Sequence, residues 1–359
     1  MRIAFTVEQC WHEVPGGTAV ATLRLAKELL THDDIELSFV AGRHRTPPAP
    51  EWTPPGPVHM LPLARPWLYE TWLRCGWPRV ESVANEIDLV HSTAGIPAAT
   101  RLANVVTLHD VAFLRRPDRL TRHGARVLTR AVDWARSASM VACPSDTVRD
   151  DLIGHGFDPD RVAVVPWGVD PIVVDDDDRQ RVRQRFDLPE RFVLAVATLE
   201  PRKNLRRLIE AMAARDEPLP LVVAGAAGWG GVLAELSSVT QRCDVRFLGH
   251  VERTDLLPLL ALAEVLAYPS EEEGFGLPVL EAMAVGTAVV TSAGTATQDV
   301  AGDAAVLVDP FDVASIAAGI DDAVRMRTQL EVAGRHRAKE FTWSATATAM
   351  IDVYRRAAR

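Results

Sequence analysis

Short apolar runs alternate with longer segments of helical periodicity along the first half of the chain. The runs are rich in Val, Ile and Phe, as is typical of buried strands, and they cover residues 2–8, 35–42, 88–92, 104–110, 139–145 and 161–169. Segments with helical spacing of apolar residues lie between them, for example 18–30 and 120–137. This alternation predicts a parallel sheet with helices on both faces.

The pattern breaks at "DPIVVDDDDRQ" (170–180) and then starts again. The second set of strand candidates covers residues 191–198, 219–225, 244–249, 264–270, 287–292 and 304–309. A chain of 359 residues also exceeds what one hydrophobic core usually supports. We therefore predict an α/β protein with two doubly wound, Rossmann-like domains, 1–172 and 173–340, in which ligands bind at the carboxyl ends of the strands.

The composition restricts the functions that such a protein can have. Hydrophobic residues make up 48% of the chain and charged residues 24%, as in an ordinary soluble protein. The net charge of −9 argues against nucleic acid as a partner, and no apolar stretch reaches membrane-spanning length. The amino-terminal "MRIAFTVEQC" is interpreted as a first strand rather than a signal peptide, and we expect a cytoplasmic protein.

Neither the cysteines nor the acidic run predicts a metal site. The four cysteines are far apart, lack metal-ligand spacing and are expected to be reduced thiols: Cys10, Cys75, Cys143 and Cys243. The run Asp175–Asp178 is interpreted as a solvated linker in which Asp177 or Asp178 caps a helix that begins near Arg179. We therefore expect no metal cofactor, because a bare linker does not hold converging ligands.

Two glutamates flank a stretch of glycine and proline in "EEEGFGLPVLEAM". The glycines and the proline exclude a continuous helix, so Glu273 should lie on a loop. Pro278 should open a helix whose first turn carries Glu281. Backbone N–H groups around Gly274 and Gly276 can approach a polar ligand closely, and the carboxylates can accept hydrogen bonds from hydroxyl groups. A sugar joined to a phosphate suits both features.

Two cations follow the strand candidate 191–198 in "LEPRKNLRRLIEAM". Arg202 and Lys203 should lie at a strand-to-helix turn, with Asn204 close to the helix start, and this arrangement favours binding of a diphosphate. Arg206 and Arg207 come one turn later and are expected on a solvated helix face.

These segments resemble glycosyltransferase family 4 (glycosyl transferases group 1), whose members have the two-domain GT-B fold. The family's signature of two glutamates separated by seven residues is similar to "PSEEEGFGLPVLEAMAVGTAVVTS", and "TLEPRKNL" resembles its phosphate-binding segment. "TLHDVAF" and "VPGGTAVATLRLAKEL" are similar to motifs of its amino-terminal domain, and "FTWSATATAMIDVYRR", within 341–359, to its last helix. In GT-B enzymes that helix crosses back onto the amino-terminal domain, and the two domains face each other across a cleft.

The resemblance implies a role for each matching residue. Glu281 would bind the ribose hydroxyls of the donor nucleotide, and Glu273 would contact the donor sugar. Arg202 and Lys203 would neutralise the diphosphate, and His109 would face the sugar from the amino-terminal domain. The expected catalytic set is His109, Glu273, Arg202 and Lys203. The other expected donor-binding positions are Gly16, Gly17, Gly274, Phe275, Gly276, Leu277 and Glu281.

One departure from the family pattern concerns the cations. Many relatives carry Gly-Arg-Leu before the lysine, whereas this sequence has Ala-Thr-Leu at 197–199. We infer that Arg202 supplies the missing charge. Fixed cations and helix-end amides can stabilise a leaving diphosphate without a metal. The leaving phosphate is the base proposed for retaining enzymes of this fold, so retention of anomeric configuration is expected.

Other residues of the amino-terminal half are weaker candidates. His91 and His12 lie near strand ends, where a histidine is often a hydrogen-bonded structural residue. "LRRPDRLTRHGARVLTR" (114–130) holds six arginines against one aspartate, and "RPWLYETWLRCGWPR" (65–79) holds three of the nine tryptophans. Basic and aromatic residues together suit an anionic lipid surface or a lipid-linked saccharide. A solvated helix face and packing within the domain are the alternatives.

The sequence thus predicts a retaining, metal-independent glycosyltransferase. It would transfer a hexose, mannose in the narrower interpretation, from a GDP- or UDP-sugar to a saccharide or lipid-linked acceptor, in peripheral contact with the inner face of the membrane. Alternatives are a catalytically inactive nucleotide-sugar-binding partner, or a GT-B sugar epimerase or phosphorylase. The segment 248–257 should form the wall of the nucleotide pocket through mostly backbone and apolar contacts, which do not identify the base.

Overall fold

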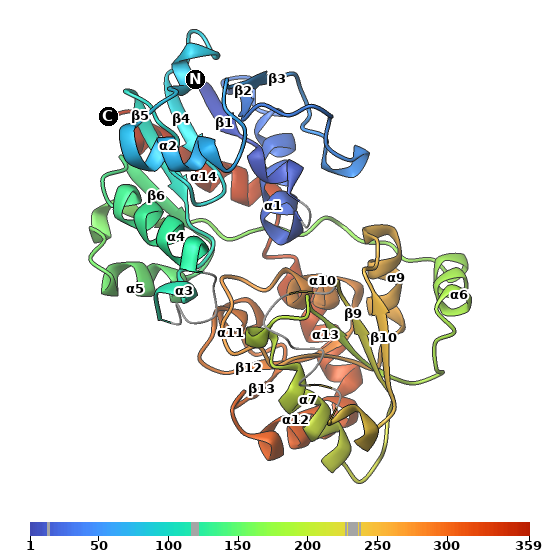
Figure 1. The fold of residues 1–359 in the computed structure, drawn as a ribbon. Coiled ribbons are helices and arrows are strands. Elements are labelled where there is room, and N and C mark those ends of the chain that lie inside the picture. The colour runs from blue at the N-terminus through green and yellow to red at the C-terminus, as the bar shows by residue number, and fades with distance from the viewer. Residues whose placement is uncertain (13–14, 116–121, 227, 229–235, 237) are drawn as a thin grey trace. The chain divides into compact units, whose positions relative to one another are not determined.

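The computed structural model describes residues 1–359 except 13–14, 116–121, 227, 229–235 and 237, and it separates into two compact units (Figure 1). Unit 1 comprises Met1–Gly168 and Thr342–Arg359, and unit 2 comprises Val169–Phe341. The expected domain borders lay at 172/173 and 340/341. The chain therefore leaves unit 1 after Gly168, completes unit 2, and returns to unit 1 for its last helix.

Unit 1 contains a seven-stranded parallel sheet in the order β3-β2-β1-β4-β5-β6-β7. Its strands are β1 (Arg2–Thr6), β2 (Glu36–Ala41), β3 (Val58–Met60), β4 (Leu89–Ser92), β5 (Ala103–Thr107), β6 (Met140–Cys143) and β7 (Val162–Val164). Its helices are α1 (Gly16–Leu29), α2 (Trp67–Cys75), α3 (Ala112–Arg115), α4 (Arg122–Ala135), α5 (Asp146–Gly154) and α14 (Trp343–Ala357). Its 3₁₀ turns are η1 (Glu8–Trp11), η2 (Pro50–Trp52), η3 (Val80–Ser82) and η5 (Pro159–Arg161).

Alternate side chains of the strands supply the two hydrophobic faces of this sheet. Ile3 and Phe5 of β1 pack with α1 and α14, whereas Ala4 between them packs with α2. The helices α4 and α5 cover the second face further along the sheet. The last helix, α14, lies against β5 and β6 and is drawn in red in Figure 1. Its Tyr354 is fully buried, so residues far apart in the sequence share one core.

Unit 2 contains a six-stranded parallel sheet in the order β10-β9-β8-β11-β12-β13. Its strands are β8 (Val193–Val196), β9 (Leu221–Ala224), β10 (Val245–Gly249), β11 (Val265–Tyr268), β12 (Ala288–Ser292) and β13 (Val306–Val308). Its helices are α6 (Asp176–Arg185), α7 (Leu205–Ala214), α9 (Arg253–Leu262), α10 (Leu277–Val285), α11 (Ala296–Ala301), α12 (Val313–Arg325) and α13 (Arg327–Ala338). The 3₁₀ turns are η6 (Pro201–Lys203) and η7 (Thr240–Arg242). Helices α7 and α12 pack on one face, and α10 packs with α9 and α13 on the other.

Each strand predicted from an apolar run is present, and each is shorter than its run. The run ends, such as 108–110 and 269–270, are loops at the carboxyl edge of the sheets. Strand β3 was missed because its three residues contain no apolar run. The prediction for the start of α6 was wrong: the helix begins at Asp176, and the Asp175 carboxylate accepts a hydrogen bond from the backbone N–H of Asp178 at 2.8 Å.

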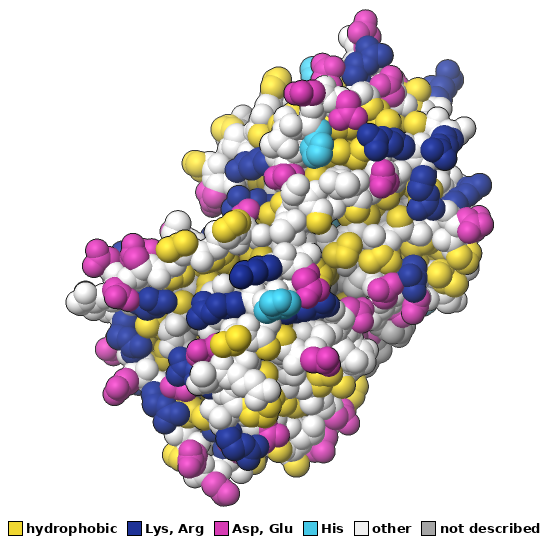
Figure 2. All heavy atoms as spheres, turned by 180° about the vertical axis from the view of Figure 1, so that it is seen from behind, with side chains coloured by type: hydrophobic (Ala, Val, Ile, Leu, Met, Phe, Trp, Pro, Cys, Tyr) yellow, Lys and Arg dark blue, Asp and Glu magenta, His cyan; other side chains and the backbone are white. Residues whose placement is uncertain are grey.

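The surface carries charges of both signs. Figure 2 shows Lys and Arg side chains interspersed with Asp and Glu side chains over the face that it presents. The chain has 39 basic and 48 acidic residues, so local clusters rather than the net charge must meet an anionic ligand. Within the described residues, no helix combines the length and the apolar character needed to cross a bilayer.

The ends of β8 and β9 approach each other so closely that position 225 requires glycine. A Cβ atom at Gly225 would lie 1.8 Å from the carbonyl oxygen of Ala197. We expect Gly225→Ala to lower the free energy of unfolding of unit 2 by about 2–3 kcal/mol, measured by calorimetry, because the two backbones must separate. Gly154→Ala, at a position with no atom within 4 Å, is the control and should be neutral or slightly stabilising. Equal unfolding of Gly225→Ala and wild type would contradict the close approach.

Candidate active site

The topology of unit 2 places a switch point between β8 and β11. These neighbouring strands continue in opposite directions along the sheet, β8 towards β9 and β11 towards β12. Ligands of open α/β sheets bind at the carboxyl ends of such strands. The 3₁₀ turn η6 follows β8, and the loop 269–276 follows β11, so both predicted polar segments emerge at this point.

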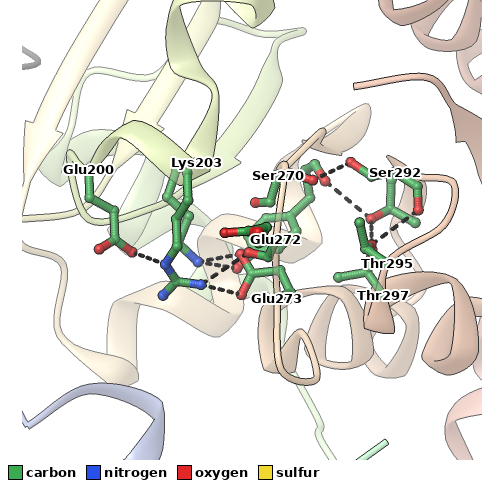
Figure 3. A network of polar contacts seen from close by, with 11 residues as sticks. Glu200, Lys203, Ser270, Glu272, Glu273, Ser292, Thr295 and Thr297 are labelled. Atoms are coloured by element: carbon green, nitrogen blue, oxygen red, sulfur yellow. Dashed lines mark hydrogen bonds and ion pairs between the residues drawn. The ribbon is translucent and has the colours of Figure 1, made fainter. Parts of the chain in front are cut away.

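The two segments meet through an ion cluster (Figure 3). Lys203 Nζ donates to Oε1 of Glu273 at 2.6 Å, and Arg202 Nη1 donates to Oε2 of the same carboxylate at 3.1 Å. The Nε atom of Arg202 lies 2.8 Å from Oε1 of Glu200, which is itself buried. The predicted cations and the predicted sugar-binding glutamate therefore form one bonded group.

The members of this ion cluster differ in their access to solvent. The side chains of Lys203 and Glu273 are 9% and 7% exposed, whereas that of Arg202 is 29% exposed. Lys203 also donates to the hydroxyl of Tyr268 at 2.7 Å and lies over its ring. Arg202 is thus the cation that is most accessible to a ligand, whereas the buried Lys203 fixes the position of the Glu273 carboxylate.

Burial and the charges of the cluster shift the pKa values of its members. Burial alone would raise the pKa of Glu273, but Lys203 and Arg202 outweigh that effect and lower it to about 2. Burial lowers the pKa of Lys203 below its usual value, against the opposing effect of Glu273. Burial, followed by the neighbouring carboxylate of Glu273, raises the pKa of Tyr268. The carboxylate therefore stays ionised at neutral pH, while Tyr268 remains a neutral donor.

A buried network of hydroxyl groups fixes the loop that carries Glu273. Ser292 Oγ donates to the carbonyl oxygen of Ser270 at 2.6 Å, and Thr291 Oγ1 donates to that of Tyr268 at 3.1 Å. Thr297 Oγ1 lies 2.7 Å from both Thr291 and Thr295 (Figure 3). These contacts come from β12 and the segment after it, so a neighbouring strand sets the loop's geometry.

Gly276 turns this loop into helix α10. Its φ of +103° lies in the left-handed region, and a Cβ atom there would lie 2.6 Å from Cγ2 of Thr297. Leu277 begins the helix, and Pro278 follows in its first turn. Phe275 is buried and packs edge-to-face on Phe341 with ring centroids 6.0 Å apart. Position 276 therefore requires glycine for two reasons: its φ is positive, and Thr297 of α11 leaves no room for a Cβ atom.

Glu281 lies just beyond the first turn of α10, whereas the sequence had predicted it within that turn. It is the fifth residue of a helix that starts at Leu277, and its side chain is 5% exposed. Arg253 Nη1 donates to Oε1 of Glu281 at 2.5 Å from the first turn of α9. A predicted ribose-binding glutamate is therefore held by a guanidinium that the sequence analysis did not single out.

The segment 248–257 contains charged side chains that pair with other parts of unit 2. Besides Arg253, it contains the buried Asp255, which pairs with Arg181 and Arg185 of α6. The prediction of mostly backbone and apolar contacts to a nucleotide base stays a prediction, because these charged side chains are paired within the protein. The charged residues were visible in "LGHVERTDLL", but only the fold shows that their partners are Glu281 and α6.

The residues that follow the cations have structural partners. Asn204 adopts φ +58° at the start of α7, and its Nδ2 donates to the carbonyl oxygens of Pro269 and Pro310 at 2.9 and 2.6 Å.

The two arginines of α7 differ in their surroundings. Arg207 Nη1 donates to Glu271 Oε1 at 2.8 Å, so the expectation that Arg207 lies on a solvated helix face was wrong. Arg206 is 59% exposed and pairs with Glu210 one turn along α7, as a solvated residue does.

The remaining predicted residues belong to unit 1. Gly16 and Gly17 are exposed and open α1, and Gly16 has φ +62° with open space where a Cβ would be. His109 follows β5, and its Nε2 donates to the carbonyl oxygen of Thr93 at 2.7 Å. Its Nδ1 is buried without a hydrogen-bond partner among the described residues, and burial lowers its pKa. Neutral His109 therefore offers Nδ1 as an acceptor.

His91 is a structural residue. Its Nδ1 lies 2.8 Å from the hydroxyl of Tyr354, and its Nε2 lies 2.7 Å from Thr107 Oγ1. Burial, with a smaller contribution from His109, lowers its pKa to about 3. The neutral ring thus connects β4 and β5 to the last helix.

The structure joins Arg202, Lys203 and Glu273 directly, and it places Gly274–Leu277 and Glu281 on the segment that follows. Gly16, Gly17 and His109 lie in unit 1. Three residues that hold the predicted ones in position were not predicted from the sequence: Glu200, Tyr268 and Arg253. Within the described residues, no group of three or more His, Cys, Asp or Glu side chains could hold a metal ion.

Comparison with known proteins identifies the class. The sequence model of "Glycosyltransferase Family 4" matches residues 15–191, and that of "Glycosyl transferases group 1" matches residues 176–341. The chain is 33% identical over 266 residues to O-antigen chain mannosyltransferase B of Escherichia coli, covering 70% of each chain. It is 33% identical over 304 residues to a D-inositol 3-phosphate glycosyltransferase of Xylanimonas cellulosilytica, covering 76% of this chain and 72% of that one.

A solved structure supports the same fold. HepE of Anabaena, in complex with UDP and glucose, matches with a TM-score of 0.75 and 21% identity over 99% of both chains. Both units have the parallel, Rossmann-like sheets of the GT-B fold. The chain belongs to glycosyltransferase family 4, the glycosyl transferases group 1, and is a glycosyltransferase.

The ion cluster predicts a pH dependence of stability. The pKa of Glu273 falls from 4.5 to about 2 on folding, so its stabilisation is complete above pH 4.5 and is lost as the pH falls towards 2. We expect the difference in unfolding free energy between wild type and Glu273→Gln to shrink by roughly 3 kcal/mol over that range. Denaturant unfolding at successive pH values measures it, with the exposed Glu190→Gln as the control. If the difference in unfolding free energy between wild type and Glu273→Gln did not change with pH, the lowered pKa of Glu273 would be contradicted.

Proposed function

We propose that this glycosyltransferase transfers a hexose from a nucleoside-diphosphate sugar with retention of anomeric configuration and without a metal ion. The observation that carries the proposal is the bonded group of Arg202, Lys203 and Glu273 at the switch point of unit 2. Two fixed cations at this point suit the diphosphate, and a buried ionised carboxylate suits the hydroxyl groups of the sugar.

The chemistry follows from these roles. The bond between the anomeric carbon and the diphosphate oxygen breaks, and its electron pair leaves with the nucleoside diphosphate. Arg202 and Lys203 stabilise the charge that grows on the leaving group. A phosphate oxygen then takes the proton of the acceptor hydroxyl, whose oxygen bonds to the same face of the anomeric carbon. Proton NMR of the first product formed should show the donor's anomeric configuration, and an inverted product would exclude this step.

The similarity to the mannosyltransferase of Escherichia coli favours mannose as the sugar. We expect a GDP-sugar as the donor because the resemblance of the segment "LEPRKNL" is to mannosyltransferases, which often use GDP-mannose. HepE was solved with UDP and glucose, so a UDP-sugar is the alternative donor. The similarity to an O-antigen chain enzyme also favours a saccharide or lipid-linked acceptor, as in polysaccharide synthesis.

Exposed aromatic residues of unit 1 support a contact with a cytoplasmic membrane surface. Trp67, Trp77 and Trp134 are 68%, 53% and 45% exposed, and the exposed Arg126 lies on the same helix as Trp134. Trp72, which belongs to the same sequence stretch as Trp67 and Trp77, is buried. Packing within the domain therefore explains only one of the three tryptophans of that stretch. Residues 116–121 of the arginine-rich stretch lie outside the described residues. The proposal fails if the protein does not sediment with anionic vesicles at low salt, or if Trp67→Ala with Trp77→Ala sediments equally.

Nucleotide binding provides the direct test of the donor site. We expect calorimetric titration with GDP, UDP, ADP and dTDP to show one preferred nucleotide, bound equally with and without EDTA. Glu281→Ala should lose this binding, and Arg202→Ala should weaken it about tenfold to a hundredfold, because charge-assisted hydrogen bonds are lost. Arg206→Ala, which removes an exposed cation from the same segment, is the matched control. Binding that requires a divalent ion, or wild-type affinity of Arg202→Ala, would contradict the proposal.

A further inference from the structure

Helix α9 packs against both α6 and α10 in unit 2, and α10 carries the predicted ribose-binding Glu281 (Figure 1). Arg253 is the first residue of α9, and its Nη1 donates to Oε1 of Glu281 at 2.5 Å. The side chain of Arg253 is 35% exposed, whereas that of Glu281 is 5% exposed. A buried carboxylate is thus paired with a guanidinium that solvent can still reach.

The position of Arg253 is unfavourable for α9 itself. The backbone N–H groups at the amino end of a helix carry positive partial charge, so a cation in the first turn is destabilising. The residue before it, Glu252, makes no side-chain capping hydrogen bond. Asp255 lies in the same turn, but its carboxylate pairs with α6. Arg253 therefore does not stabilise its own helix, and its contact with Glu281 provides the reason for its place.

Asp255 anchors this turn of α9 on α6. It is 1% exposed and pairs with two arginines of α6, Arg181 and Arg185, each of which contacts a different carboxylate oxygen. Near the other end of α9, Thr287 Oγ1 donates to the carbonyl oxygen of Leu260 at 2.7 Å. Helix α9 is therefore fixed at both ends, and the side chain of its first residue starts from a defined position.

The contact with Arg253 is compatible with ligand binding by Glu281. The two oxygens of an ionised carboxylate offer about four acceptor positions, so a bond from a guanidinium does not prevent bonds from hydroxyl groups. A neighbouring guanidinium favours the ionised form of a carboxylate, and an ionised acceptor forms stronger hydrogen bonds than a neutral one. The planar guanidinium also restricts the orientation of the carboxylate that it binds.

We propose that Arg253 is a positioning residue that orients Glu281 towards the ribose of the donor nucleotide, and that α6 supports it through Asp255. The inference rests on the proposed function, because it takes Glu281 as the ribose-binding carboxylate. It adds two consequences to that function. Selectivity for a ribose with both hydroxyl groups depends on a residue that acts through Glu281, and two arginines of α6 contribute to this selectivity without contact with the nucleotide.

Calorimetric titration with GDP and UDP, each compared with its 2′,3′-dideoxy form, tests the role of Arg253. We expect wild type to bind the preferred ribonucleotide about tenfold to a hundredfold more tightly than its dideoxy form, because the hydroxyl groups bind Glu281. Arg253→Ala should reduce this preference to about threefold or less and should bind the dideoxy form as wild type does. An equal loss of affinity for both forms, or an unchanged preference, would overturn the proposal.

A second variant of the same residue keeps the charge at this position. Arg253→Lys should retain part of the ribose preference, because an ammonium group pairs with the carboxylate but lacks the planar fork of a guanidinium. Thermal melting followed by circular dichroism shows whether each variant is folded. If Arg253→Lys bound the ribonucleotide and the dideoxy form more weakly to the same degree, Arg253 would not act through the ribose, and the proposal would be overturned.

The contribution of α6 is tested separately. Arg181→Ala combined with Arg185→Ala removes the partners of Asp255, and we expect the ribose preference to fall about threefold. Arg179→Ala on the same helix is the matched control, because Arg179 pairs with Asp176 at 3.0 Å, and its nucleotide binding should equal that of wild type. An unchanged preference in the double variant would overturn the role of α6.

The same titrations separate this inference from the proposed function. If wild type bound neither GDP nor UDP, the donor site of unit 2 would be contradicted, and the inference with it. If wild type bound a ribonucleotide and Arg253→Ala kept the full ribose preference, the inference alone would be overturned.

Discussion

The buried pair of Lys203 and Glu273 is the interaction on which the site of unit 2 depends. Each charge buried alone would be strongly unfavourable, so the loops after β8 and β11 must remain together. Hydrogen bonds also connect the two loops. The backbone N–H of Glu271 donates to the carbonyl oxygen of Arg202, and the side-chain amide of Asn204 donates to the carbonyl oxygen of Pro269. By holding the two loops together, the pair of Lys203 and Glu273 also fixes the position of the more exposed Arg202.

The two switch points use different chemistry. In unit 2, opposite charges compensate each other, and a glycine turn leads directly into α10. In unit 1, whose switch point lies between β1 and β4, the rings of His91 and His109 are neutral and buried, and the buried carboxylate of Glu8 accepts a hydrogen bond from the backbone N–H of Gly42. The first arrangement suits a ligand that carries charge. One fold thus has two switch points with distinct electrostatic properties.

Much of this architecture could be predicted from the sequence, because apolar runs and loop glycines are local signals. The strand pattern indicated two parallel sheets, and Gly276 with Pro278 located the start of α10 to within one residue. The partners of the predicted residues could not be found in this way. Arg253 and Glu281 are distant in the sequence, and Glu8 becomes notable only because the fold buries its carboxylate while Gly42 and His44 contact just one of its two oxygens. Short patterns identify residues, whereas burial and pairing depend on the whole fold.

The return of the chain to unit 1 has a consequence for synthesis on the ribosome. Helix α14 follows unit 2 in the chain, yet Ala347, Met350 and Tyr354 are buried in the core of unit 1. A Cβ atom at Gly168 would lie 2.3 Å from the backbone nitrogen of Trp343, so the outgoing and returning segments are also packed together. Unit 2 can complete its core as it emerges, while the earlier-synthesised unit 1 must wait for the last helix. The core of unit 1, although most of it is synthesised first, can therefore be completed only after the whole of unit 2 has been synthesised.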